Sequence, residues 1–409
     1  MNSVTTVDRT AAAVIGLVLC ALLAAPQGAA ARIIAVPDNA ATIKAAMFKA
    51  QAGDRILVAC GTYREHDIQV KPGVSVWSGT LQPDCVIIDP EGNGRAFVFI
   101  DADSNTTLVG FTIRNGRRLG SGEDGYGGAV LCVASSPKIT NCVLQDNAAG
   151  RGGALYADAR SLPRVINCLL MGNQATQGGA VFWQGRGGTI EDCSFRGNHA
   201  LLGGAIYGAS ADGLRVTTSH FLGNEAGNAG GGAYLADADV EFTGCVLAGN
   251  WGGLGGGALA TTGRPPRLVN CTLVDNDVEF DGAALASSDG GPSLQHCIVA
   301  LHRRSLLRSA GEPPSFDTCN LYGNTAGDWT GILAAQARQR GNFSSDPRFC
   351  APAAGDYHLD GASTCLPGNR SRDDGKLVGA LGKGCNGTQS SALGHDASAG
   401  HFQALRAGL

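Results

Sequence analysis

The sequence predicts an all-β protein, a right-handed parallel β-helix of about ten coils with an N-terminal capping helix. Three features predict it. A cysteine recurs every 25 or 26 residues, an asparagine follows five residues later in every copy but the last, and a Gly-Gly-Ala element recurs in step. Self-similarity at a fixed period is the signature of a repeat protein. The cysteine positions, with serine in the one gap, are Cys142, Cys168, Cys193, Ser219, Cys245, Cys271 and Cys297.

The length of the repeat indicates which kind of solenoid the chain forms. A period near 25 is shorter than the roughly 33 to 47 residues of paired-helix repeats. The apolar runs within each repeat have strand length and end at Gly or Asn, as in "GGAIYG" from Gly203. Because no helix separates these strands, they can stack in parallel only if the chain coils.

Apolar columns flank the cysteines. The residues three before and two after each cysteine are apolar, and we expect them to fill the interior. The cysteine itself is interpreted as a small buried filler. The alternatives are a metal site and a chain of disulfides. A metal site needs thiolates that converge, whereas a column presents them in a line. Neighbouring positions about 4.8 Å apart leave one or two disulfide pairs possible. The spacings also make Cys60–Cys85 and Cys350–Cys365 candidate disulfides.

The N-terminus has the pattern of an export signal. The apolar run Ala11–Ala25 precedes small residues, so residues 1–31 are predicted to be a signal peptide. After its removal no stretch is long and apolar enough to span a bilayer. We therefore expect a secreted or cell-surface protein without a transmembrane span.

The remaining chain is expected to form one β-helix domain over residues 32–383. A short helix at about 41–51 should plug its N-terminal end, since open sheet edges need covering. Residues 303–345 depart from the repeat and are expected to form irregular late coils, and residues 384–409 a disordered tail. The apolar face of the helix comprises Ile43, Ala46, Met47 and Ala50.

Charge and composition limit the partners. Only 16% of residues are charged, the net charge is −4, and the linear sequence shows no basic stripe, so a nucleic-acid partner is not expected. No oxygen-rich loop of fixed spacing suggests a cation, and we expect neither a metal nor a cofactor. A monomer is expected.

Several motifs resemble known families. "GGA" plus an aliphatic residue, alternating with "FRGN" at Phe195 and "FLGN" at Phe221, resembles the repeats of chlamydial-type polymorphic outer membrane proteins. "TIKAAMFKAQAGDRILVACGTYRE", from Thr42, resembles the start of pectin-lyase-like right-handed β-helix proteins, and "GDYHLDGASTCLPGN" resembles the closing segment of some of them. The resemblance covers about residues 33–383. It implies the fold but leaves the activity open, because this fold hosts lyases, hydrolases, esterases, epimerases and adhesins.

One column of residues is a candidate ligand platform. The position two after Gly-Gly-Ala is predicted to point outward, stacking rings at about 5 Å, with Trp183 beside them. Such a row could hold a glycan chain. The alternative is a buried aromatic stack of the opposite orientation. The column comprises Leu131, Tyr156, Phe182, Tyr207 and Leu235.

A second column follows the asparagines. There His199 and Glu225 are expected to pair, and Trp251 beside Asp277 has the character of a sugar-binding edge. The candidate ligand-binding residues are Tyr156, Phe182, Trp183, Tyr207 and Trp251, and no catalytic residue is assigned.

These features favour an exported protein that binds a glycan or a cell-surface partner, in the manner of an adhesin. One alternative is a polysaccharide lyase or hydrolase with acids from irregular segments such as residues 116–126 or 303–345. A second alternative is a structural surface protein without a specific ligand. Whether the protein is an enzyme stays open at this point.

Overall fold

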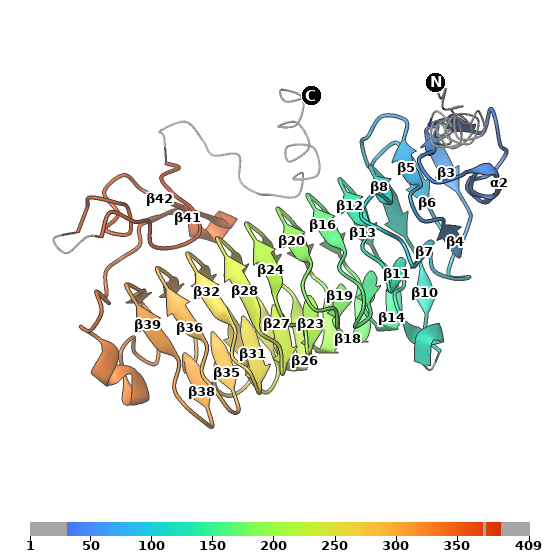
Figure 1. Cartoon of the computed structure of the whole chain (residues 1–409). Coiled ribbons are helices and arrows are strands. Elements are labelled where there is room, and N and C mark those ends of the chain that lie inside the picture. The colour runs from blue at the N-terminus through green and yellow to red at the C-terminus, as the bar shows by residue number, and fades with distance from the viewer. Residues whose placement is uncertain (1–30, 121, 371–373, 386–409) are drawn as a thin grey trace, which may run out of the picture. The chain divides into compact units, whose positions relative to one another are not determined.

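The computed structural model describes residues 31–120, 122–370 and 374–385. The expected signal peptide, apart from Ala31, and residues 386–409 of the expected tail lie outside this part. From residue 33 onward the chain winds into a right-handed parallel β-helix, as Figure 1 shows. Each regular coil passes through four sheets, which we call A, B, D and C in chain order. Sheet B has eleven strands in the described chain, close to the ten coils expected.

The strands of the four sheets succeed one another at one coil per strand. Sheet A consists of β1 (Ile33–Val36), β2 (Arg55–Val58), β5 (Ser75–Ser78), β8 (Thr107–Val109), β12 (Lys138–Thr140), β16 (Arg164–Ile166), β20 (Thr189–Glu191), β24 (Leu214–Thr217), β28 (Val240–Thr243), β32 (Arg267–Val269), β36 (Ser293–Gln295) and β39 (Ser315–Asp317). Sheet B consists of β3 (Gly61–Tyr63), β6 (Val86–Ile88), β9 (Thr112–Arg114), β13 (Val143–Gln145), β17 (Leu169–Met171), β21 (Ser194–Arg196), β25 (His220–Leu222), β29 (Val246–Ala248), β33 (Thr272–Val274), β37 (Ile298–Ala300) and β40 (Asn320–Tyr322). Sheet D consists of β10 (Arg117–Arg118), β14 (Ala148–Arg151), β18 (Gln174–Gln177), β22 (His199–Leu202), β26 (Glu225–Ala229), β30 (Trp251–Gly252) and β34 (Asp277–Val278). Sheet C consists of β4 (Ile68–Val70), β7 (Phe97–Ile100), β11 (Val130–Val133), β15 (Leu155–Ala157), β19 (Val181–Trp183), β23 (Ile206–Ala209), β27 (Ala233–Ala236), β31 (Leu259–Thr262), β35 (Leu285–Ser287) and β38 (Leu307–Ser309).

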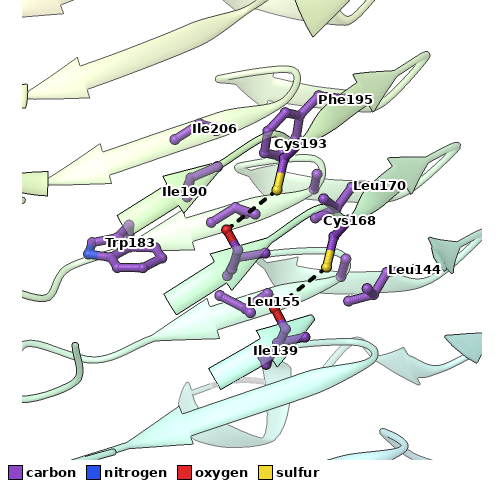
Figure 2. Close-up of a cluster of buried hydrophobic side chains, with 14 of the residues drawn as sticks. Ile139, Leu144, Leu155, Cys168, Leu170, Trp183, Ile190, Cys193, Phe195 and Ile206 are labelled. Carbon is purple, nitrogen blue, oxygen red and sulfur yellow. Dashed lines mark hydrogen bonds between the residues drawn. The ribbon is translucent and has the colours of Figure 1, made fainter. Parts of the chain in front are cut away.

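The cysteine column lies in the interior, as expected. Figure 2 shows Cys168 and Cys193 among the apolar side chains of the core. Their thiols donate to the carbonyl oxygens of Ile139 and Val165, at 3.7 and 3.5 Å. In the described chain, none of the cysteines of this column is in a disulfide. They act as small buried fillers whose polar hydrogens are satisfied by the coil below.

The repeated asparagines form a buried amide ladder between sheets B and D. The backbone nitrogen and Nδ2 of Asn173 both donate to Oδ1 of Asn198, at 3.0 Å each. Nδ2 also donates to the carbonyl oxygen of Leu144 at 2.9 Å. The ladder asparagines do not themselves adopt the left-handed conformation. The residue just before each ladder position has positive φ instead, as Asp146 and Gly172 do.

The N-terminal cap matches the expectation. Helix α2 (Ile43–Lys49) begins at Thr42, whose side chain accepts from the nitrogen of Ala45. The predicted apolar face is buried in the main core, where it covers the first strands of the β-helix. This closes an end that would otherwise expose unpaired strand edges.

The late segment is more regular than expected. Within residues 303–345, strands β38, β39 and β40 extend sheets C, A and B by another coil. The 3-10 helix η2 (Gly331–Gln336) follows, and Trp329 meets Phe316 edge-on at 5.5 Å between ring centroids. Oε1 of Gln336 accepts from the nitrogen of Phe316 at 2.9 Å. These contacts cap the C-terminal end of the core.

The last segment folds back onto sheet B. It contains the hairpin of β41 (Phe349–Ala351) and β42 (Asp356–Leu359), with the short 3-10 helix η3 (Pro352–Ala354) between them. Leu359 and Val378 bury the outward-facing Ile298. Residues Gly384 and Cys385, assigned to the disordered tail, are held in place here, since the nitrogen of Gly384 donates to Leu359.

One predicted disulfide is confirmed and one is wrong. Cys60 and Cys85 are bonded on neighbouring coils. Cys350 bonds Cys385 rather than Cys365. The reason is the fold of the last segment. Strand β42 pairs with β41, and Leu359 in turn pairs with Lys383, so the chain end comes beside Cys350. The thiol of Cys365 is buried and receives a hydrogen bond from Nδ2 of Asn320 instead.

Candidate functional site

The outward face of sheet C carries a ladder of aromatic rings. Alternation along each strand places Leu155 in the lumen and Tyr156 outside, and the same holds for Val181 and Phe182. The ring centroids are 4.3 Å apart at the first step and 5.2 to 5.3 Å at the others, with planes within 15° of parallel. The ladder, in order, is Tyr126, Tyr156, Phe182, Tyr207 and Tyr234.

The outward orientation of this column is confirmed, but its last member is corrected. Tyr234, not Leu235, is the register partner of Tyr207. Leu235 is fully buried in the main core. An extra residue enters at the bulge between β22 and β26, so Ile206 pairs with Ala233, and Gly232 rather than Ala233 stands opposite Ala205. The Gly-Gly-Ala element read from the sequence at Gly231 is therefore one residue out of step with the other coils. A shift of one residue turns every side chain to the other face.

Stacking makes the ladder a poor surface for a ligand. Phe182 is 2% exposed and Tyr156 is 5% exposed, because each ring covers the faces of its neighbours. The guanidinium of Arg151 lies over Tyr126 and Phe182, at 5.4 and 5.1 Å from the ring centroids. Burial raises the pKa of Tyr156 to about 12. A sugar stacks on an open ring face, and these faces are already in contact with one another.

Trp183 does not accompany the ladder. It is fully buried in the lumen, as Figure 2 shows, and Nε1 donates to the carbonyl oxygens of Gly185 and Gly187 at 3.2 Å. The expectation that it lies beside Phe182 on the surface was wrong. Neighbouring residues of a strand point to opposite faces, so an outward Phe182 already implies that Trp183 points inward.

Sheet D presents a second row, and this one is open to solvent. Its members are register partners on successive strands, about 4.8 Å apart. The first three are exposed and the last two are half-buried. The row comprises Gln174, His199, Glu225, Trp251 and Asp277.

His199 and Glu225 form the expected pair, and Asp277 has a partner in Arg304 that the sequence did not predict. Nδ1 of His199 lies 3.2 Å from Oε2 of Glu225, and both side chains are about half exposed. Nε of Arg304 lies 3.5 Å from Oδ1 of Asp277. The indole of Trp251 stands between the two carboxylates, because Glu225 and Asp277 are its register partners on either side.

Glycines and apolar side chains surround the indole. A Cβ at Gly253 would stand 3.3 Å from Cη2 of Trp251, so the ring rests against bare backbone. Three exposed apolar side chains follow the same edge of sheet D: Leu201, Leu254 and Phe280, at 52, 47 and 57% exposure. Together with Trp251 they make an uncovered apolar edge flanked by hydrogen-bonding groups.

The segment 116–126, a possible source of catalytic acids, forms a charged network. Nη2 of Arg118 lies 2.6 Å from Oδ2 of Asp67, which also meets Nδ1 of His66 at 2.9 Å. The buried Arg95 donates to the carbonyl oxygen of Glu123 at 2.9 Å and so holds the 3-10 helix η1 (Gly122–Gly125). These hydrogen bonds lower the pKa of Asp67 although burial opposes them. The network fastens the loop beside β10, the first strand of sheet D.

Ser194 and His220 are register partners on neighbouring strands, and Oγ of Ser194 accepts a hydrogen bond from Nε of Arg196 at 2.9 Å. Across the described ranges, no group of three or more His, Cys, Asp or Glu side chains is placed to hold a metal ion. None of the helices in those ranges is long and apolar enough to cross a membrane.

The fold and the comparisons define a class. The protein is a parallel β-helix protein whose regular coils display open sheet faces. The family model described as the Chlamydia polymorphic membrane protein repeat matches residues 192–209. The crystal structure of pectate lyase Pel9A is similar in fold, with a TM-score of 0.54, 13% identity, and coverage of 87% of this chain and 97% of that chain. No curated protein sequence matches the chain.

Proposed function

We propose that the protein is exported by its N-terminal segment, residues 1–31, and binds a neutral glycan on the outer face of sheet D, centred on Trp251. The observation that carries the proposal is the row on sheet D in which the half-buried indole of Trp251 stands between the carboxylates of Glu225 and Asp277. Aromatic rings hold sugars by their apolar face, while carboxylates accept hydrogen bonds from hydroxyl groups.

The charge of the row supports a neutral ligand. Glu225 and Asp277 flank Trp251 on both sides, and an anionic sugar would meet them at close range. Like charges in such a position oppose binding. The apolar edge of Leu201, Leu254 and Phe280 extends the surface along the direction in which the coils stack, which suits an extended chain.

The test is binding of a panel of neutral and acidic oligosaccharides to the purified protein, measured by calorimetry. We expect Trp251→Ala to lower the affinity for a neutral oligosaccharide at least about tenfold. Phe48→Ala is the matched control, because Phe48 is 85% exposed on α2, far along the chain from sheet D. Equal affinity of the wild type and Trp251→Ala for the neutral oligosaccharide would overturn the proposal. So would a loss of affinity in Phe48→Ala as large as that in Trp251→Ala.

Cleavage of the glycan is the second candidate function. Its support is the His199–Glu225 pair, in which the imidazole can orient a carboxylate or share its proton, together with the fold similarity to a pectate lyase. The same panel decides it. Release of reducing or unsaturated ends that Glu225→Gln abolishes would favour cleavage over simple binding.

A further inference from the structure

Sheet A carries a row of cationic side chains on its outer face. Lys138 pairs in register with Arg164, and the same position on later strands holds Arg215 and Arg267. The three arginines are exposed and Lys138 is half-buried. The linear sequence showed no basic stripe, because one to two whole coils separate these residues along the chain. Coiling brings them into a single line.

One acid, Glu241, stands in this row between Arg215 and Arg267, but it makes an ion pair with neither. None of the four has a carboxylate partner within ion-pair distance among the described residues, whereas Arg264 pairs with both Asp212 and Asp237. The nearest polar contact is from Nη2 of Arg267 to Oε1 of Gln295, at 3.0 Å. In a protein of net charge −4, an unpaired cationic line is a place of positive potential.

The spacing of the row is regular. Arg164, Arg215 and Arg267 stand on every second strand, so neighbouring arginines are about 9.6 Å apart. The strands between them present Thr189 and Glu241 at the same position. The row therefore alternates between a cation and a group that can accept a hydrogen bond.

We propose that this row binds a linear anionic polysaccharide in which an acidic sugar alternates with a neutral one. In an extended chain of sugars, each ring advances the polymer by roughly the distance between strands, so acidic groups on every second sugar meet the arginines. The neutral sugars then face Thr189 and Glu241, whose oxygens hydrogen-bond hydroxyl groups. The site lies on a different sheet from Trp251 and goes beyond the function proposed above.

The pattern disfavours other polyanions. The neighbouring outward row of sheet A holds Glu191 among residues such as Thr217 and Thr243, so the face as a whole is not cationic enough for a membrane surface. Single-stranded nucleic acid is held by stacking on aromatic rings. Between β12 and β32 neither outward row carries one.

The experiment uses the full chain and three probes of equal length. The first is a hyaluronan oligosaccharide, with one carboxylate for every two sugars. The second is a neutral N-acetylglucosamine oligosaccharide, and the third is a polygalacturonate oligosaccharide, with a carboxylate on every sugar. Binding is measured at low and high salt, and anionic vesicles and a single-stranded oligonucleotide are tested in parallel.

The stripe variant combines Arg164→Gln, Arg215→Gln and Arg267→Gln, all exposed positions whose replacement leaves the core intact. A control of the same charge change combines Lys44→Gln, Arg303→Gln and Arg338→Gln, which lie off sheet A. We expect the hyaluronan probe to bind best, to weaken with salt, and to lose about tenfold in affinity in the stripe variant only.

Several results would overturn the proposal. They are a loss of neutral-probe binding in the stripe variant as large as the loss of hyaluronan binding, an equal loss of hyaluronan binding in the control, tightest binding of polygalacturonate, or binding of vesicles or the oligonucleotide in place of the glycan. Trp251→Ala separates the two sites. If Trp251→Ala abolishes binding of the acidic probe and the stripe variant does not, the row on sheet A is not the site. If Trp251→Ala leaves binding of the neutral probe unchanged, only the function proposed for sheet D is contradicted.

Discussion

His302 lies beside Asn276 in the next position of the amide ladder, but it does not continue the ladder. Both ring nitrogens of His302 are buried, and neither has a hydrogen-bond partner of good geometry among the described residues. Its backbone nitrogen still donates to Oδ1 of Asn324, so the ladder resumes on the following coil. A buried polar group without a partner costs about 1 to 3 kcal/mol.

Replacing His302 by asparagine should therefore stabilise the protein. The new amide could accept from Asn276 and donate to the carbonyl of Leu273, as the other members do one coil apart. We expect His302→Asn to raise the free energy of unfolding by about 1 to 2 kcal/mol in urea. Asn250→His is the reciprocal change and should destabilise by a similar amount or more. A lower unfolding midpoint in His302→Asn would contradict the account.

The same residue predicts an acid dependence. Burial lowers the pKa of His302 from 6.5 to about 3. Below pH 6.5 the imidazole of His302 is therefore protonated in the unfolded chain but stays neutral in the folded chain. The free energy of unfolding then falls as the pH falls, down to about pH 3. Relative to His302→Asn, the wild type should lose about 1.4 kcal/mol per pH unit in this window. Parallel pH curves of the two proteins would exclude a neutral buried imidazole.

The interior thiols should be inert in the native protein. Burial raises the pKa of Cys142 and Cys168, and the cysteines of the column are at most 3% exposed. A thiol reagent reacts with the thiolate, so labelling should proceed only upon unfolding. Mass spectrometry of the labelled protein, with and without denaturant, measures this. Rapid native labelling of Cys168 would contradict its place in the lumen.

Serine should substitute for cysteine within the column. Ser219 already does so, since its Oγ donates to the carbonyl oxygen of Thr217 at 2.8 Å and accepts from the nitrogen of Cys193 at 3.1 Å. We expect Cys193→Ser to cost less than about 1 kcal/mol, and Cys193→Leu to cost about 1 to 3 kcal/mol through overpacking. Thermal unfolding of the two variants tests this, and equal losses would argue against a filler role.

Two glycines of similar φ separate backbone strain from crowding. Gly178 has φ 66°, and a Cβ there would stand 2.1 Å from the carbonyl oxygen of Val181. Gly223 has φ 59° and nothing within 4 Å of its Cβ position. We expect Gly223→Ala to cost about 1 to 2 kcal/mol, and Gly178→Ala to cost at least about 4 kcal/mol. Similar losses of stability in the two variants would mean that the turn at Gly178 does not depend on close backbone contact.

Much of the fold could be predicted because the same residue pattern recurs on each coil and places the same positions in the interior. Apolar residues three before and two after Cys168 face inward for the same reason on every coil, and the asparagines ladder because like residues stack. The prediction failed where one coil differs from the others. The extra residue at the bulge of β26 put Tyr234 rather than Leu235 on the outer face. Nothing in the spacing of Cys350 and Cys365 reveals that the chain returns to pair Cys350 with Cys385.

The sequence by itself determined the period, the coil, the buried columns and the capping helix, because these follow from local periodicity and burial. Only the tertiary structure decided what the outer faces offer. Stacking buried the rings of Tyr156 and Phe182 that had been candidates for a platform, left Trp251 between two carboxylates, and aligned Arg164, Arg215 and Arg267. The reason is geometric: a surface site on a β-helix is made of residues one coil apart, and their neighbours exist only once the coils are stacked.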